Sequence, residues 1–69
     1  MRPWQIEEGG RLVSYDEALV LRAEIGPHWA GGYQLRIVNT MEDVTVELKQ
    51  CKSVEEAKAA ADDWVERNL

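Results

Sequence analysis

The chain has 69 residues, of which 13 are acidic and 8 are basic, so its formal net charge at pH 7 is −5. Its single cysteine and single histidine exclude an internal disulfide and a zinc site with four ligands of its own. The acidic balance disfavours direct nucleic-acid binding and favours a basic protein surface as partner. This length predicts one small domain, residues 1–69, with a core of limited size.

The sequence shows no signal for secretion, membrane insertion, catalysis or cofactor binding. Residues 1–8, MRPWQIEE, lack the apolar run of a secretory signal, and no stretch reaches the roughly 20 apolar residues of a membrane span. The glycine pairs at 9–10 and 31–32 belong to no phosphate-binding fingerprint, and neither serine lies in a nucleophile motif. We therefore expect a cytoplasmic protein that is not an enzyme, holds no metal or cofactor and contacts no membrane.

Residues 4–15 predict an N-terminal hairpin around Gly9-Gly10. A two-residue loop gives three cross-strand pairs: Glu8–Arg11, Ile6–Val13 and Trp4–Tyr15. The alternative is a loosely ordered segment, because the first arm is short and polar.

Residues 14–27 allow two interpretations. As a helix, they begin with a capping box of Ser14 and Glu17 and end at Gly26. As a strand, they alternate apolar residues on one side, namely Leu19, Leu21, Ala23 and Ile25. The strand is favoured because Val20 falls on the polar side of the helical wheel.

Residues 26–32, GPHWAGG, predict a loop, since glycine and proline mark turns. Trp29 in this loop either folds onto the core or serves as a partner-binding anchor, because tryptophan is enriched at binding hot spots. A surface role is favoured for His28 over that of a general base, since no acidic residue is near it in sequence.

Residues 33–39 and 44–51 predict a second hairpin. In the chosen register Asn39 pairs with Val44, and each strand then shows one apolar and one polar face. The predicted inner face consists of Tyr33, Leu35, Ile37, Val46 and Leu48. Cys51 then ends its strand on the outward face, as a semi-exposed thiol without reactivity.

Residues 53–68 predict a helix that packs on that inner face. Ser53 and Glu56 form a capping box, and alanines without glycine or proline favour the helix. At 100° per residue, one side is apolar and consists of Val54, Ala57, Ala60, Ala61, Trp64 and Val65. The other side is acidic and consists of Glu55, Glu56, Asp62, Asp63 and Glu66.

The acidic side of this helix is either a solvated face or a binding surface. Acids at the helix start are explained locally, because they favour the N-terminus. Asp62 and Glu66 repel each other four residues apart, and Arg67 offsets only part of the charge through Asp63. We therefore assign six candidate partner-binding residues: Glu55, Asp62, Asp63, Glu66, Trp29 and His28.

These elements predict an α+β fold, an antiparallel meander of three to five strands with one C-terminal helix on one face. The combination of Trp4, the Gly31-Gly32-Tyr33 strand entry and the closing SVEEAKAAADDWV resembles small phage and prophage proteins of this architecture. Some small acidic phage proteins of this size resemble anti-CRISPR inhibitors, which bind a bacterial defence nuclease or its guide complex. The resemblance implies that the chain binds a bacterial defence complex, and it transfers no individual site residue.

The predicted function is a non-catalytic protein-binding module that engages a basic partner surface. The first alternative is an assembly subunit that forms a homodimer through its open sheet face or edge. The second alternative is an enzyme without a recognisable motif.

Overall fold

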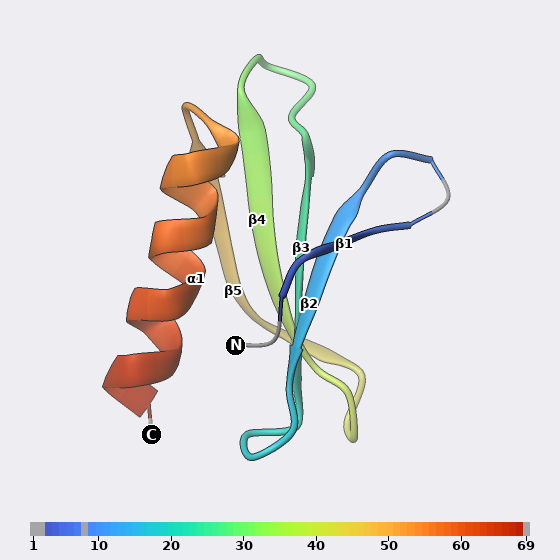
Figure 1. Cartoon of the computed structure of the whole chain (residues 1–69), viewed down its shortest axis with the longest axis vertical. Coiled ribbons are helices and arrows are strands. Elements are labelled where there is room, and N and C mark those ends of the chain that lie inside the picture. The colour runs from blue at the N-terminus through green and yellow to red at the C-terminus, as the bar shows by residue number, and fades with distance from the viewer. Residues whose placement is uncertain (1–2, 8, 69) are drawn as a thin grey trace.

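The computed structural model describes residues 3–7 and 9–68, which form a five-stranded antiparallel sheet and one C-terminal helix. The elements are β1 (Gln5–Ile6), β2 (Leu12–Asp16), β3 (Leu21–Pro27), β4 (Tyr33–Asn39), β5 (Val44–Cys51) and α1 (Val54–Asn68). The strands lie side by side in chain order, and α1 lies on one side of them (Figure 1). The predicted α+β meander with a C-terminal helix is confirmed.

The core lies between α1 and the face of β3, β4 and β5 that the helix covers. Apolar residues alternate along β3 and β4, so each strand directs one set of side chains toward the helix. The buried side chains of this set are Leu21, Ala23, Ile25, Leu35 and Ile37. The buried residues of the helix are Ala57, Ala61 and Val65. Because two of these are alanines, α1 approaches the sheet closely, and the half-buried Trp64 packs against the same cluster.

Helix α1 begins as the sequence predicts. Ser53 Oγ accepts a hydrogen bond from the Glu56 N–H at 3.1 Å, and the Glu56 carboxylate accepts one from the Lys52 N–H at 2.6 Å. The Ser53 bond occupies a donor that the first helical turn leaves unpaired, whereas the Glu56 carboxylate bonds the residue before the N-cap and not the Ser53 N–H of a regular capping box. Within the described part of the chain, no helix is both long and apolar enough to cross a membrane.

The strand interpretation is confirmed for residues 21–27 and is wrong for residues 17–20, which form a turn, and the helical alternative is wrong. The segment contains the end of β2, a turn at residues 17–20 and then β3. Asp16 Oδ1 accepts a hydrogen bond from the Leu19 N–H at 3.1 Å, and Val20 has a positive φ of 55°. This turn places Leu19 outside the strand alternation.

The N-terminal hairpin is present, but its predicted register is wrong by one residue. Ile6 lies opposite Leu12 and not opposite Val13. The Glu7 N–H donates to the Arg11 carbonyl at 2.8 Å, so the loop is longer than the two glycines. Both glycines have positive φ, 90° and 81°, and hairpin loops of more than two residues often contain a left-handed glycine.

The shift separates Trp4 from Tyr15, so the predicted aromatic pair does not form. Trp4 packs against the core cluster, whereas Tyr15 lies opposite Arg22 in the sheet. A slip of one residue exchanges the two faces of a strand, which accounts for this separation. The predicted Glu8–Arg11 pair lies outside the described residues, because it includes Glu8.

The β4–β5 hairpin begins in the predicted register and then departs from it. Asn39 pairs with Val44 and Val38 with Thr45, as predicted. A β-bulge follows and leaves Val46 unpaired. Beyond the bulge, the pairs are Ile37–Glu47, Arg36–Leu48, Leu35–Lys49, Gln34–Gln50 and Tyr33–Cys51.

The bulge exchanges the two faces of β5. Val46 and Leu48, predicted to face the helix, are 42% and 59% exposed, and Tyr33 is also exposed. Cys51, predicted on the outward face, is buried in the core. Leu48 and Cys51 are three residues apart, so a regular strand places them on opposite faces. The structure buries Cys51, next to the start of the helix, and leaves Leu48 outside.

Candidate protein-binding surfaces

Strand β5 is one edge of the sheet, because β4 is its only neighbouring strand among the described residues. Three large apolar side chains of β5 are exposed: Val44 by 49%, Val46 by 42% and Leu48 by 59%. An edge strand presents unpaired backbone groups, and exposed apolar side chains beside them favour pairing with another chain. We call this surface the β5 edge.

The hydrogen bond of the Leu48 N–H indicates which way the backbone of the β5 edge faces at this residue. The Leu48 N–H donates to Oε1 of its own neighbour Glu47 at 3.2 Å. Amide groups alternate in direction along a strand, and one that is bonded to the adjacent strand has no room for a side-chain acceptor. We infer that the Leu48 N–H points away from β4.

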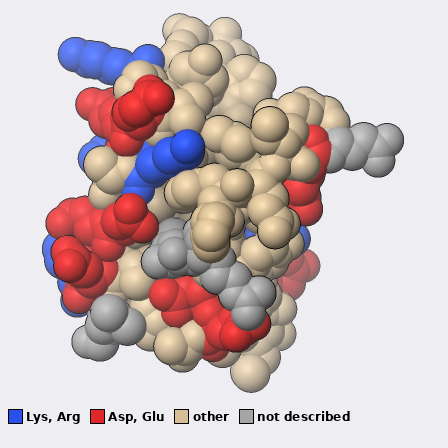
Figure 2. Space-filling model, viewed as in Figure 1, with Lys and Arg blue, Asp and Glu red and all other residues tan. Residues whose placement is uncertain are grey.

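The acidic residues of α1 are exposed, and Figure 2 shows acidic side chains gathered over the helix. Glu56 and Asp63 have local partners, since Glu56 caps the helix and Asp63 forms an ion pair with Arg67 at 3.1 Å. Among the described residues, no ion pair is found for Glu55, Asp62 or Glu66. We call these five acids the acidic face: Glu55, Glu56, Asp62, Asp63 and Glu66.

The Trp29 side chain is 93% exposed, so the alternative of a core tryptophan is wrong. The His28 ring stacks on Trp29, with ring centroids 5.6 Å apart and planes at 25°. His28 Nδ1 also accepts a hydrogen bond from the Ala30 N–H at 3.0 Å, which is local support and not a catalytic arrangement. The loop therefore presents an aromatic surface to solvent.

The predicted partner-binding residues do not form one site. His28 and Trp29 belong to a loop held against the end of β5, where the Gly31 carbonyl accepts a hydrogen bond from Gln50 Nε2 at 3.1 Å. Asp62 lies eight residues beyond the start of α1, which is about 12 Å along a helix axis. The loop and the distal acids are therefore separate surfaces.

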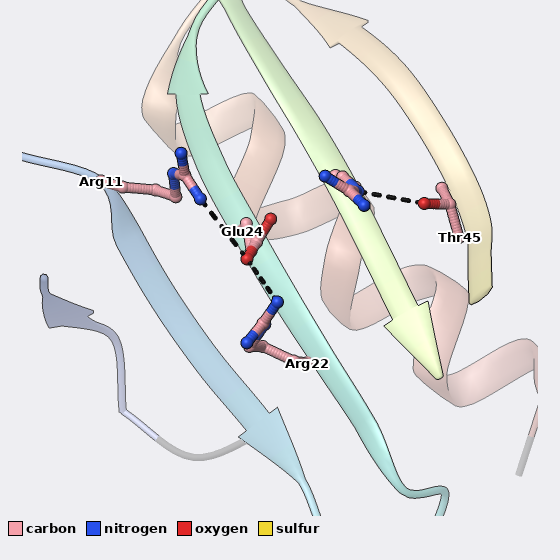
Figure 3. Close-up of polar contacts among 5 residues, drawn as sticks. Arg11, Arg22, Glu24 and Thr45 are labelled. Atoms are coloured by element: carbon pink, nitrogen blue, oxygen red, sulfur yellow. Dashed lines mark hydrogen bonds and ion pairs between the residues drawn. The ribbon is translucent and has the colours of Figure 1, made fainter. Parts of the chain in front are cut away.

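Sequence reasoning missed a charged cluster on the face of the sheet opposite α1. Glu24 is 6% exposed, and its Oε2 lies 2.9 Å from Arg22 Nη2 and 3.6 Å from Arg11 Nη1 (Figure 3). Arg36 lies opposite Glu24 in the β3–β4 pairing and donates through Nε to Thr45 Oγ1 at 3.0 Å. Arg22 and Glu24 were recognisable as neighbours on one strand face, whereas the other two arginines depend on strand register.

Cys51 is buried, and burial is the main cause that raises the pKa of its thiol. The Glu56 carboxylate also raises this pKa, and the Lys49 ammonium group lowers it. A raised pKa keeps the thiol protonated at neutral pH, which disfavours a nucleophilic role. The prediction of a semi-exposed thiol is therefore wrong. The described residues include no group of three or more His, Cys, Asp or Glu side chains that could hold a metal ion.

Three surfaces are thus available for contact: the β5 edge, the acidic face and the Trp29 loop. Of these three, only the β5 edge combines exposed apolar side chains with the backbone of an edge strand. No protein-family model, curated protein or solved structure matches this chain, so its function is inferred from these surfaces.

Proposed function

We propose that this chain is a non-catalytic protein-binding module that associates with a second copy of itself along the β5 edge. The observation that carries this proposal is the exposed side chain of Leu48 on an edge strand, beside an N–H that bonds to Glu47 Oε1 and that we infer to point away from β4. Antiparallel pairing of two such edges joins two sheets into one and removes both open edges.

The sequence of β5 is complementary to itself about Leu48. With the twofold axis at Leu48, its N–H donates to the Leu48 carbonyl of the second copy, and its carbonyl accepts from the Leu48 N–H of that copy. Glu47 then lies opposite the lysine that corresponds to Lys49, and the reverse pair forms on the other side of the axis. Opposite charges facing each other across an antiparallel pair contribute roughly 0.2–1 kcal/mol, and the interface is isologous as a twofold dimer requires.

The charges also select this register over its neighbours. A shift of two residues in one direction sets Glu47 against Glu47, and a shift in the other direction sets Lys49 against Lys49. Like charges directly opposite each other are destabilising. The bulge at Val46 interrupts the regular ladder as well, which limits pairing with unrelated strands.

Charge reversal at the two positions tests the proposal. Glu47→Lys alone and Lys49→Glu alone are each expected to weaken self-association at least about tenfold, because each replaces two attractive pairs with two repulsive ones. The double variant Glu47→Lys with Lys49→Glu restores both pairs and is expected to restore association. Sedimentation equilibrium across a concentration series measures this, since the apparent mass moves between 7.9 kDa and twice that value.

A backbone variant separates pairing from folding. Leu48→Pro removes the N–H that points away from β4, and edge strands tolerate proline where the N–H faces solvent. We expect this variant to stay monomeric and folded. The proposal is overturned if the wild-type chain keeps its monomer mass at every concentration, or if the two single charge variants associate as strongly as wild type.

A second candidate function is docking of the acidic face on a basic partner protein. Its supporting observation is that Asp62 and Glu66 are exposed, repel each other at a spacing of four residues and have no ion pair among the described residues. A repulsion that destabilises the helix and that no nearby basic residue offsets is typical of residues kept for binding. A bacterial complex with a basic surface is the partner that the resemblance to phage inhibitors implies.

Asp62→Lys with Glu66→Lys is expected to leave the melting temperature unchanged or slightly higher, because it removes a repulsion worth about 0.2–0.5 kcal/mol. Binding to a poly-lysine peptide at low salt is expected to fall at least about tenfold, and wild-type binding is expected to weaken as salt screens charges beyond about 8 Å. Fluorescence anisotropy of the labelled peptide measures both effects. The matched control is Glu7→Lys with Glu42→Lys, which changes the net charge equally. If both variants bind equally weakly, only net charge matters and the acidic face is a solvated surface.

A further inference from the structure

The face of the sheet opposite α1 carries positive charge although the chain is acidic. Arg11 and Arg22 lie beside the buried carboxylate of Glu24, and Arg36 stands opposite it on β4, so these four side chains have a net charge of +2 when each arginine counts as +1 and Glu24 as −1. We call this group the arginine cluster: Arg11, Arg22, Arg36 and Glu24. Arginine stays charged at all physiological pH values, so this charge persists.

A pocket of about 330 Å³ opens beside the arginine cluster. Arg11 and Arg36 line it together with Glu24, Gly26 and Gln34. The absence of a side chain at Gly26 leaves space in the pocket, since a Cβ added there meets no atom within 4 Å. This volume is near the lower end for ligand pockets, which suits a small molecule or one charged group of a larger one.

The donors of the cluster exceed its acceptors. Glu24 Oε2 forms an ion pair with Arg22 Nη2 at 2.9 Å. Its distance of 3.6 Å from Arg11 Nη1 is longer than a hydrogen bond. Arg22 Nε is buried and finds no acceptor among the described residues. Arg36 uses its Nε for Thr45, which leaves its terminal amino groups free to donate into the pocket.

We propose that this pocket binds the phosphate group of a small phosphate monoester. Arg11 directly precedes β2 and Arg36 lies on β4, with β3 between these strands, and the side-chain amide of Gln34 supplies a further donor. A phosphate monoester presents three outer oxygens and accepts bonds from several directions, whereas a carboxylate offers a single planar edge. The charged residues that line the pocket are Arg11, Arg36 and Glu24, which sum to +1, so the pocket favours an anion such as a phosphate group of charge about −2. No residue of β5 lines the pocket, so this site does not depend on self-association.

Titration with phenyl phosphate at constant ionic strength tests the assignment by backbone amide NMR. The wild-type chain is expected to show saturable shifts at Gly26, Gln34 and Arg36. Arg11→Gln with Arg36→Gln is expected to weaken binding at least about tenfold, since hydrogen bonds between charged groups are the strong ones. The matched control is Lys58→Gln with Arg67→Gln, which removes the same charge from α1 and is expected to bind like wild type.

A variant with a larger side chain at Gly26 keeps all charged residues of the pocket and reduces only the pocket volume. Gly26 lies in a strand outside the left-handed region, so Gly26→Val is expected to fold and to weaken phenyl phosphate binding at least about tenfold. Thermal melts of all variants verify that they are folded. The proposal is overturned by shifts that stay linear or spread to the α1 amides, by undiminished binding in Gly26→Val, or by benzoate binding as tightly as phenyl phosphate.

Discussion

Trp64→Ala is expected to lower the free energy of unfolding by roughly 3 kcal/mol, at the lower end of the range for large aromatic residues in cores. The lower end applies because Trp64 is half-buried. Of the described residues on the apolar side of α1, Trp64 is the only large one, and the others are alanines and valines. Because a domain of this size has a total stability of only about 5 kcal/mol, about 2 kcal/mol remains, so the variant is expected to stay mostly folded at 25 °C and to melt at a much lower temperature than wild type.

Circular dichroism melts at one protein concentration measure this effect. A loss of that size corresponds to a fall of roughly 12–24 °C, since 1 kcal/mol shifts the melting temperature of a small domain by about 4–8 °C. The matched control is Trp29→Ala, which removes the same atoms from a side chain that is 93% exposed. Its effect is expected to stay within about 0.5 kcal/mol. Equal losses in the two variants would contradict the packing of α1 described above.

Gly32→Ala is expected to destabilise the chain by a comparable amount. Gly32 has a φ of +71°, and an L-residue in a left-handed conformation costs about 1–2 kcal/mol. A Cβ at this position would also lie 2.6 Å from the carbonyl oxygen of Cys51. That neighbour is backbone, so the loop or the end of β5 must shift, and overpacking of this kind costs about 1–3 kcal/mol more.

Gly10→Ala is the matched control for this second effect. Gly10 also has a positive φ, +81°, but a Cβ there meets nothing within 4 Å. Gly10→Ala is therefore expected to lower the free energy of unfolding only by the cost of the left-handed backbone conformation, about 1–2 kcal/mol. Urea denaturation of the three proteins gives the difference. If the two alanine variants are equally stable, the close approach of Gly32 to Cys51 has no energetic consequence.

The candidate surfaces were predictable to different degrees. The acidic face followed from the sequence, because side-chain directions on a helix depend only on spacing along the chain. The loop around Trp29 was also predictable, but its exposure was not, since no local rule determines whether a loop side chain folds back. The β5 edge was not predictable, because Leu48 was assigned to the buried face of its strand and is exposed.

The arginine cluster shows the same dependence on register. Arg22 and Glu24 share a strand face in the sequence pattern, since they are two residues apart. Arg36 lies opposite Glu24 only because of the β3–β4 pairing, and Arg11 reaches Glu24 only because of the β2–β3 pairing. Three segments distant in sequence therefore contribute to one pocket.

By itself, the sequence determined the C-terminal helix and its limits, the β4–β5 hairpin and the buried sides of α1 and β3, but it left residues 14–27 open between strand and helix. These features depend on capping, turn residues and periodicity, which act over a few residues. Only the tertiary structure decided the registers of β1–β2 and β4–β5. A shift of one residue changes no local propensity, yet it exchanges the two faces of a strand. Packing under α1 decided that Cys51 joins the core, and Leu48 consequently lies exposed on the β5 edge.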